Sequence, residues 1–576
     1  MRNKIDLSLP PEAVFLNPWQ DEGIALLRRP EFYWRPIAPA LIEGFAVSAH
    51  MAIHDKITNF LAVTKKHRCF AQALEFNSVP VLLHKVSFRK SFVMAQDRLL
   101  LSGAAGARSL NSYRWENEGE GKNPEAELVA YFEACQMANT EADLPLAAEP
   151  FDPDLPFAIE CRNTFNYFHF LTESLSQLCL LDGLDHRGPI FFHFPNAEEK
   201  RRPFARAFVD ALFPDLADRV VFERTPKDYE KVLTAFDLLG GIFQAPDAVA
   251  AGLDALAPSN HIWKGREARV SAQGMLAANA VSSGLIALRE RGLRAIQGQD
   301  FTHLPRRFFV GRDTRHSRSR VMQGEDLLFE HLQMFGFEYV VFESLSPAEQ
   351  VAIMANAEMM VSYHGAGFAN MIFANPDAYL IEVGTLQTAQ FRWGDFWQHA
   401  HVSQCRYISF FADFNQADPL VEPNFSKDGI VPVAMSAGAV GQLMGFVVTL
   451  LGHVPDLPRV DDLLVLARQL FQVRAFAQAE ALLAQHDKLC MWSVDLCLLK
   501  ADCHKELDEP KSELVALDRA YKADRNRWQT LIRLIWCANR CKRPQVIRWA
   551  LTRLQADFPE RHDAFVSNHE WVRYVV

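Results

Sequence analysis

Short apolar runs alternate with amphipathic segments through the second half of the chain. Residues 307–310, 359–363 and 379–383 are apolar runs typical of buried strands. Between them, residues 325–335 carry leucine at helical spacing. Ser346-Pro347 is typical of a helix start, because serine caps the first turn and proline fits into it. This alternation predicts an α/β fold in which helices cover a parallel sheet.

The same alternation occurs earlier in the chain. Residues 189–194 are typical of a strand and residues 203–213 of a helix. We therefore expect one Rossmann-like lobe over residues 151–300 and a second over residues 301–457. Residues 1–150 hold shorter alternating runs, which predict a small β-rich lead-in.

The pattern changes to helical periodicity from about residue 458, and glycine disappears after Gly452. Leu466-Ala467 and Lys500-Ala501 lie in similar contexts, separated by the period of the tetratricopeptide repeat, about 34 residues. The Trp, Gly and Tyr positions typical of that repeat are not kept. We predict degenerate, tetratricopeptide-like helix pairs over residues 458–576; an ordinary helical cap on the catalytic lobes is the alternative.

Composition excludes several classes of protein. Of the 576 residues, 49% are hydrophobic and 11% aromatic, which supplies material for large cores and argues against disorder. The formal net charge of −10 argues against a nucleic-acid-binding protein, which usually needs a basic surface. The ten cysteines show no paired metal-binding spacing, so we expect reduced thiols in a cytoplasmic protein.

We expect no transmembrane segment. The longest apolar run, residues 443–451 inside a helix predicted over residues 436–451, is far shorter than the ~18 residues needed to cross a bilayer. Residues 1–9 alternate charged and apolar side chains, unlike a secretory signal. Attachment at the inner face of a membrane through partner proteins is the alternative to a free cytoplasmic enzyme.

The clearest chemical signal is a glycine-spaced turn that follows the strand at residues 359–363. It reads His364-Gly365-Ala366-Gly367, and Asn370 comes shortly after. Glycine lets the backbone approach a ligand closely. The helix expected next directs free N–H groups and a positive dipole end toward that ligand. The turn therefore predicts a phosphate site.

A second signal is a polar face on the helix that begins near residue 166. Asn166, His169, Glu173 and Gln177 recur at helical spacing, and apolar side chains occupy the other side. Histidine or glutamate on such a face can act as a general base. The alternative is a solvated helix face with a capping asparagine.

Two separated segments together carry the positions of one known enzyme family. In chain order these are Asn166-Tyr167-Phe168-His169, Arg312 at a strand end, Gln350, His364-Gly365-Ala366-Gly367, Asn370, Phe373 and Glu382. In these positions the chain resembles glycosyltransferase family 61, over about residues 150–410. The resemblance implies a GT-B fold, in which two Rossmann-like lobes enclose a central cleft. It also implies an inverting transferase that moves a sugar from a nucleotide sugar, expected to be a UDP sugar, to a glycan acceptor in polysaccharide or capsule biosynthesis.

The resemblance assigns candidate site residues. His169 and Glu173 are the candidate catalytic residues; the candidate donor-binding residues are Arg312, His364, Gly365, Ala366, Gly367, Asn370 and Glu382. Glu382 is expected to bind a pair of ribose hydroxyls, with a strand-end surface salt bridge as the alternative. Arg315, Arg318 and Arg320 are either further phosphate ligands or part of a solvated basic loop.

No metal ion or other cofactor is expected beside the nucleotide-sugar substrate. The one Asp-x-Asp of note, at residues 152–154, falls in a proline-rich turn that makes a poor metal site. Stabilisation of the leaving diphosphate would then depend on Arg312, His364 and helix N–H groups.

Two other functions stay open. A nicotinamide-dependent oxidoreductase could use the glycines at 365 and 367, but its fingerprint normally follows the first strand and ends in Gly or Ala, whereas this turn ends in Asn370. A non-catalytic scaffold could use its helical repeats to recruit other polysaccharide-assembly proteins while its transferase core has decayed. Turnover of a nucleotide sugar would distinguish the enzyme from the scaffold.

Overall fold

The computed structural model divides into two compact units. One comprises Met1–Glu325 with Gly336–Ala434, and the other Asp326–Phe335 with Met435–Val576. The structure describes residues 5–37, 41–66, 72–76, 78–89, 92–140, 143–148, 150–161, 166–194, 203–236, 260–263, 266–269, 280–312 and 322–574.

One half of the first unit is built on a parallel sheet. In spatial order its strands are β16 (Glu338–Val340), β15 (Arg307–Val310), β17 (Met359–Tyr363), β18 (Tyr379–Thr385) and β19 (Arg406–Phe414). α11 (Pro347–Ala355) starts where the sequence predicts, and Ser346 and Glu349 form a complete capping box at its N-terminus. The predicted α/β class is confirmed.

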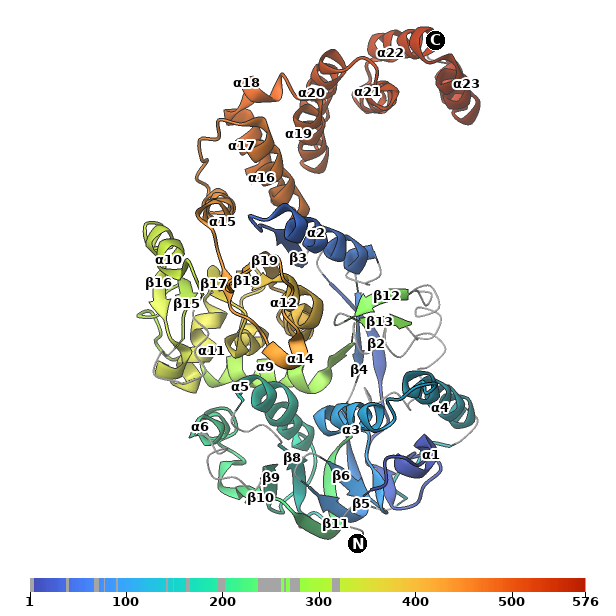
Figure 1. Ribbon diagram of the computed structural model, residues 1–576, viewed down its shortest axis with the longest axis vertical. Helices are drawn as coiled ribbons and strands as arrows, with labels where there is room; N and C mark the ends of the chain where they lie inside the picture. Colours follow the sequence, from blue (N-terminus) through green and yellow to red (C-terminus); the bar gives the residue numbers. More distant parts are fainter. Residues whose placement is uncertain are drawn as a thin grey trace. The chain divides into compact units, whose positions relative to one another are not determined.

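The N-terminal region supplies the edge of this sheet. β3 (Ile42–Ala46) runs parallel to β19, with Phe45 beside Phe410 in the register. Figure 1 shows β3 in blue next to β19. α2 (Met51–Lys66) packs against β3. A strand from the start of the chain therefore completes a sheet whose other members come from residues beyond 300.

A second, mixed sheet forms the other half of the first unit. In spatial order its strands are β10 (Val220–Arg224), β9 (Ile190–Phe194), β8 (Phe157–Glu160), β11 (Lys227–Phe236), β5 (Val79–Phe88), β6 (Val93–Ala95) and β7 (Arg98–Leu99), with β1 (Ile24–Leu26) on β5. β8, β9 and β10 are parallel, whereas β11 pairs antiparallel with β5. Strands from residues 1–150 thus lie in both sheets, and β2 (Phe32–Pro36) and β4 (Gln72–Phe76) lie in a third sheet with β14 (Ala280–Ser282), so they form no separate lead-in.

Helical segments between the two sheets bring them together. α5 (Tyr167–His169) packs against η7 (Ala366–Phe373), and η2 (Leu175–Leu181) packs against α9 (Ser283–Ala295). α9 also contacts η7 and α11. The segment that carries the predicted polar face therefore lies against the segment that follows the glycine-spaced turn.

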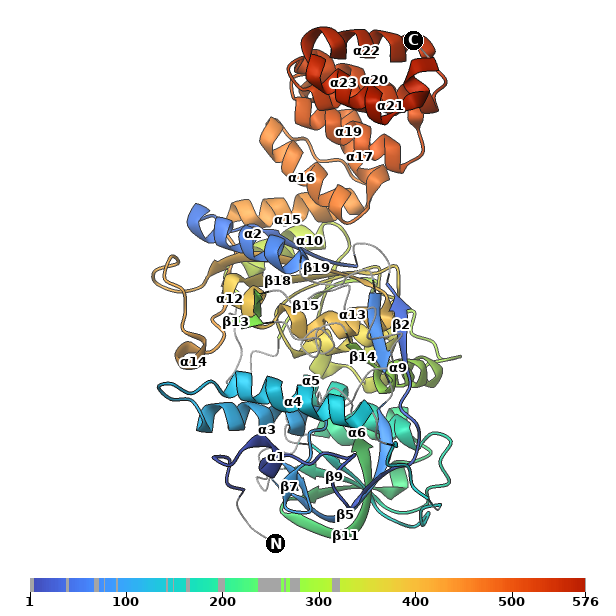
Figure 2. The ribbon, with the colours of Figure 1, turned by 90° about the vertical axis from the view of Figure 1, so that its right-hand side faces the viewer.

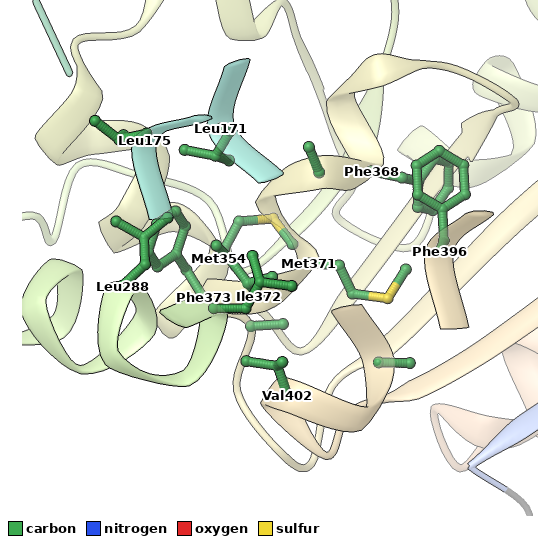
Figure 3. Close-up of a cluster of buried hydrophobic side chains, with 14 of the residues drawn as sticks. Leu171, Leu175, Leu288, Met354, Phe368, Met371, Ile372, Phe373, Phe396 and Val402 are labelled. Carbon is green, nitrogen blue, oxygen red and sulfur yellow. The ribbon is translucent and has the colours of Figure 1, made fainter. Parts of the chain in front are cut away.

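One hydrophobic core runs through these helices. In Figure 3, Leu171 and Leu175 gather with Leu288, Ile372 and Phe373. All five side chains are fully or almost fully buried. α9 approaches closely because its residue 292 is glycine, where a Cβ atom would lie 2.5 Å from the Phe373 ring. The faces of the two sheets that these helices cover therefore share one core.

The second unit is a row of helix pairs with a regular period (Figure 2). The first helices of three successive pairs, α16 (Val460–Gln472), α19 (Val494–Glu506) and α21 (Trp528–Arg540), begin at a constant interval that equals the tetratricopeptide period of about 34 residues. Their partners α17 (Phe476–Gln485), α20 (Pro510–Ala523) and α22 (Pro544–Asp557) follow one another at the same interval. Ala467, Ala501 and Ile535, which occupy equivalent positions, are all 0% exposed. The predicted helical region is present with its predicted repeat spacing.

The turn inside each pair adopts the same conformation. Arg474, Asp508 and Lys542, which are again one repeat apart, have φ angles of 60°, 56° and 54°. This left-handed region favours glycine, which is absent from the sequence beyond Gly452. The repeat geometry is therefore maintained without the residue that fits this turn at least cost.

α15 (Ala437–Leu450) is the helix predicted over residues 436–451. Ser436 caps it, with its hydroxyl accepting a hydrogen bond from the Ala439 N–H at 3.1 Å. α15 packs against α16 and α17, so the second unit begins before the expected boundary at residue 458. Across the described part of the chain, no helix has both the length and the apolar character needed to cross a membrane.

Candidate functional site

The carboxyl ends of β15 and β17 meet where the parallel sheet changes its winding direction. β15 has β16 on one side and β17 on the other, so the connection from β16 to β17 passes across β15. In open α/β sheets, ligands bind outside the strand ends at such a point. Arg312 follows β15 and His364 follows β17, so the structure brings two predicted donor-binding residues together there.

A buried carboxylate on the neighbouring strand holds His364. The Nδ1 atom of His364 lies 2.6 Å from Glu382 Oε1. The other oxygen of Glu382 accepts hydrogen bonds from the Ser409 hydroxyl, at 3.1 Å, and from the Tyr407 hydroxyl. Glu382 and Tyr407 are 0% exposed. Burial, followed by the charge of Glu382, holds the pKa of Tyr407 well above its usual value.

The position of Glu382 differs from the prediction. β18 continues to Thr385, so Glu382 lies within the strand instead of at its end. A surface salt bridge is therefore wrong for this residue, because its side chain is completely buried and its ionic partner His364 is 13% exposed. Three protein donors occupy the carboxylate, and a ribose would have to displace them. In this structure Glu382 positions His364.

Arg312 packs along the same strand ends. Its Nη2 donates a hydrogen bond to the His364 carbonyl at 2.7 Å, and its guanidinium carbon lies 4.8 Å from the centre of the Tyr363 ring. Burial raises the pKa of Tyr363 to about 12, so this ring is neutral near pH 7. A guanidinium has five N–H donors, and the bond to His364 uses one of them. Arg312 is partly exposed, which suits it to contact a ligand.

The two glycines of the turn make room for side chains of the protein. A Cβ atom at Gly365 would lie 2.7 Å from Arg312 Nη2, and one at Gly367 would lie 3.1 Å from the Phe342 ring. Ala366 begins the 3-10 helix η7, and the first N–H groups of any helix lack intrahelical partners. That these N–H groups bind a phosphate stays a prediction.

Asn370 lies in the core. Its Oδ1 accepts a hydrogen bond from the Tyr167 hydroxyl, and its Nδ2 donates to Gln350 Oε1 at 3.2 Å. Gln350 in turn donates to the carbonyls of Phe342, at 2.9 Å, and Leu345, at 3.1 Å. Asn370 is 0% exposed. Its side chain therefore links α5 to α11 of the parallel-sheet half in this structure, instead of facing a donor as the sequence predicted.

His169 and Glu173 form a second histidine–carboxylate pair. The Nδ1 atom of His169 lies 2.7 Å from Glu173 Oε1, and the two side chains are 36% and 27% exposed. Asn166 caps the segment by accepting a hydrogen bond from the His169 N–H at 3.3 Å. Gln177 donates to the Glu173 carbonyl at 2.8 Å. The structure thus brings together the residues of the predicted polar face.

The helical segment that carries this pair is irregular. It begins as α5 and continues as a π-helix, η1 (Phe170–Ser174), and then as the 3-10 helix η2, where the sequence predicted one α-helix. Thr172 Oγ1, within η1, lies 2.8 Å from Nε2 of His399 on α13 (Trp397–Ser403). Burial lowers the pKa of His399 to about 3, so this histidine is neutral. Short π-helical turns are rare in proteins overall, and those that occur are often found at functional sites.

Two aromatic rings lie between the two pairs. The Phe168 ring centre lies 5.3 Å from that of His169 and 5.6 Å from that of Phe396. The Phe396 ring centre in turn lies 5.4 Å from that of His364. Both predicted groups of polar residues therefore border one aromatic cluster, although they come from distant parts of the sequence.

An open pocket lies beside His364, and residues 430–433 form part of its wall. Gln387 holds this wall. Its Nε2 donates to the Gly429 carbonyl at 2.6 Å, and its Oε1 accepts from the Val431 N–H at 2.9 Å. Gln387 is 2% exposed, so both bonds are protected from water.

Sequence reasoning missed Tyr407, Ser409 and Gln387. A weak signal existed for the first two, because they stand at alternate positions of an apolar strand and so share one face. Arg315, Arg318 and Arg320 lie outside the described residues. Within the described residues, no group of three or more His, Cys, Asp or Glu side chains is arranged to hold a metal ion.

The chain resembles known proteins over parts of its length. The family model described as Glycosyltransferase 61 matches residues 167–381. No curated protein sequence matches the chain. Among solved structures, the crystal structure of MamA is similar with 16% sequence identity and a TM-score of 0.18, covering 22% of this chain and 76% of that chain.

Proposed function

The chain belongs to glycosyltransferase family 61 through residues 167–381, and on this premise we propose that it transfers a sugar from a UDP sugar to a hydroxyl group of a glycan acceptor, with inversion. The observation that carries the proposal is the pair of histidine–carboxylate contacts around one aromatic cluster. His169 with Glu173 lies within the matched region, and His364 with Glu382 lies at its end. Such a transfer would be a step in polysaccharide synthesis.

In the proposed donor site, His364 and Arg312 face the diphosphate. Arg312 is partly exposed beside the end of β17, and when Nδ1 of His364 bonds to Glu382, a protonated Nε2 is left to donate to a ligand. The first N–H groups of η7 add to the positive potential at the same strand ends. These groups would stabilise the charge that develops as the nucleoside diphosphate leaves.

In the proposed acceptor site, His169 is the general base. It takes the proton of the acceptor hydroxyl as that oxygen bonds to the anomeric carbon, and the bond from this carbon to the diphosphate oxygen breaks on the opposite face. A single displacement of this kind inverts the anomeric configuration. Glu173 orients the imidazole through Nδ1, which leaves Nε2 as the basic atom.

We assign the two sheets to the two lobes of a GT-B arrangement. The parallel sheet would bind the nucleotide, because its strand ends hold Arg312 and His364. The mixed sheet would present the acceptor side through α5 and η1. Separate sheets whose connecting helices share a core are consistent with this assignment.

A screen of nucleotide sugars with the full-length chain tests the proposal. We expect hydrolysis or transfer with at least one UDP sugar, and NMR of the first-formed product should show the inverted anomer. Calorimetry should give tighter binding of UDP than of ADP. Absence of turnover with every donor, together with absence of UDP binding, would contradict the proposal.

A non-catalytic scaffold is the second candidate. The regularly spaced helix pairs favour it, because stacked repeats offer extended surfaces for partner proteins. Its partners would be other proteins of polysaccharide assembly. If substitutions on the repeat surface leave turnover at the wild-type level, the repeats are not needed for catalysis, and the catalytic and scaffold roles are separate.

A further inference from the structure

Two residues beyond the family match complete the environment of the donor-site histidine. Tyr407 and Ser409 lie on β19, past the end of the matched region at residue 381. In the parallel register Glu382 stands beside Ser409 and Leu380 beside Tyr407, so the three polar side chains share one face of the sheet. Both hydroxyl groups donate to the same oxygen of Glu382.

The two hydroxyl donors compensate for the burial of Glu382. A carboxylate with no exposure loses its hydration and needs compensating donors. Among the described residues its ionic partner is His364 alone, at 2.6 Å. Tyr407 and Ser409 are also 0% exposed, so their bonds to Glu382 are not weakened by water.

We propose that Tyr407 and Ser409 are positioning residues for the donor site, because they hold Oε2 of Glu382 and thereby direct Oε1 to Nδ1 of His364. The proposal rests on the proposed function for the statement that His364 contacts the donor. With Oε1 fixed, Nδ1 of His364 keeps its proton and the ring keeps one orientation. When Nε2 is protonated as well, its N–H is directed at the diphosphate and can donate to it.

Other charged and titratable groups surround this pair. Just past the end of β15, Arg312 donates to the carbonyl of His364, and Tyr363 precedes His364 at the end of β17. From η8 (Trp393–Phe396), the charge of Asp395 contributes to the raised pKa of Tyr407, after burial and Glu382. Both tyrosines stay neutral through the physiological range, because burial raises their pKa.

The test compares the double variant Tyr407→Phe/Ser409→Ala with Tyr113→Phe. Tyr113 is a suitable control because it is also buried and its hydroxyl also bonds to a carboxylate, that of Glu127, at 3.2 Å in another part of the unit. Nitrogen-15 NMR of histidine-labelled full-length chain, with His364→Gln for assignment, reports the tautomer of His364 without any ligand. Calorimetry with UDP at pH 7 reports donor binding.

We expect the double variant to show a mixture of His364 tautomers and a roughly tenfold loss of UDP affinity at pH 7. Tyr113→Phe should match the wild type in both measurements. An unchanged tautomer and UDP affinity in the double variant, or equal changes in the control, would overturn the proposal.

The tautomer of His364 and the affinity for UDP can change independently of each other. If the wild type binds no UDP while the tautomer of His364 still depends on Tyr407 and Ser409, the proposed function fails and the positioning role stands. If UDP binds and the tautomer does not respond, the positioning role fails and the proposed function stands.

Discussion

The two histidine–carboxylate pairs have nearly the same contact distance and very different surroundings. His169 and Glu173 are one helical turn apart in sequence, and both are about one-third exposed. His364 and Glu382 come from neighbouring strands, and the carboxylate is completely buried with two further donors. An exposed pair gains little stability from its attraction, whereas a buried pair depends on every partner. The exposed pair is therefore suited to exchange protons, and the buried pair to hold a fixed orientation.

The largest effect should come from the exposed pair. In the proposed mechanism His169→Ala removes the base, so kcat should fall by roughly 10²–10⁴ while UDP affinity stays near the wild-type value. His364→Ala should weaken UDP binding as well. Initial-rate kinetics and calorimetry on both variants check this. If the two variants lose kcat and UDP affinity alike, the division of roles between the pairs is wrong.

For the stability of the fold, the buried pair should give the larger effect when each carboxylate is removed in turn. Glu382→Ala leaves Tyr407, Ser409 and His364 without their acceptor, so the free energy of unfolding should fall by about 3 kcal/mol. Glu173→Ala should cost less than about 1 kcal/mol, because that pair is screened by water. Denaturant unfolding followed by tryptophan fluorescence measures both. Equal losses of unfolding free energy in the two variants would mean that burial makes no energetic difference between the two pairs.

Arg312 tests whether the buried pair faces the donor. Arg312→Ala should weaken UDP binding by about 1.5–3 kcal/mol, because a charge-assisted contact to phosphate is lost. Arg307→Ala is the matched control: Arg307 begins the same strand, at its far end, and bonds to Glu358 at 2.9 Å. Calorimetry should find the control close to wild type. Similar losses in both variants would place the nucleotide elsewhere.

His399 supports the helix of the exposed pair and should make stability depend on pH. Its pKa is lowered from 6.5 to about 3 by burial, so the unfolded chain binds a proton that the folded chain does not. This contribution to stability is complete above about pH 6.5 and is lost as the pH falls toward 3. Between pH 7 and pH 5, the single histidine should therefore cost about 2 kcal/mol.

Denaturant unfolding at the two pH values measures this cost. His399→Asn should flatten the decline by about that amount, whatever its effect at pH 7. His303→Asn is the control, because its side chain is 60% exposed. A decline in His399→Asn as steep as that of the wild type would show that His399 does not titrate in this way.

Gly365→Ala should give the smallest effect. The new Cβ atom would lie 2.7 Å from Arg312 Nη2, and the end of a flexible arginine can move aside. UDP affinity should fall by about 1 kcal/mol as the charge-assisted contact becomes less well aligned. Gly441→Ala on α15 has open space around it and should leave UDP affinity unchanged. An unchanged affinity in Gly365→Ala would separate the glycine from the donor site.

Local patterns predicted the elements that need few distant partners. The strand at residues 189–194 is β9, the helix at 203–213 is α6 (Pro203–Leu212), and the Ser346-Pro347 start is a capping box. The spacing of the helix pairs also followed from the sequence, because each repeat buries the same positions against its neighbours. The contact between His169 and Glu173 required only helical spacing.

Tertiary structure alone decided how the pieces combine. The pairing of β3 with β19, the burial of Asn370 against Tyr167, and the enclosure of Glu382 by Tyr407 and Ser409 all join residues far apart in the chain. Periodicity shows that a residue lies in a strand or a helix, because that property is set within one or two turns of backbone. It does not show which strand lies alongside or whether a polar group meets water or a partner, because burial is decided by the packing of distant segments.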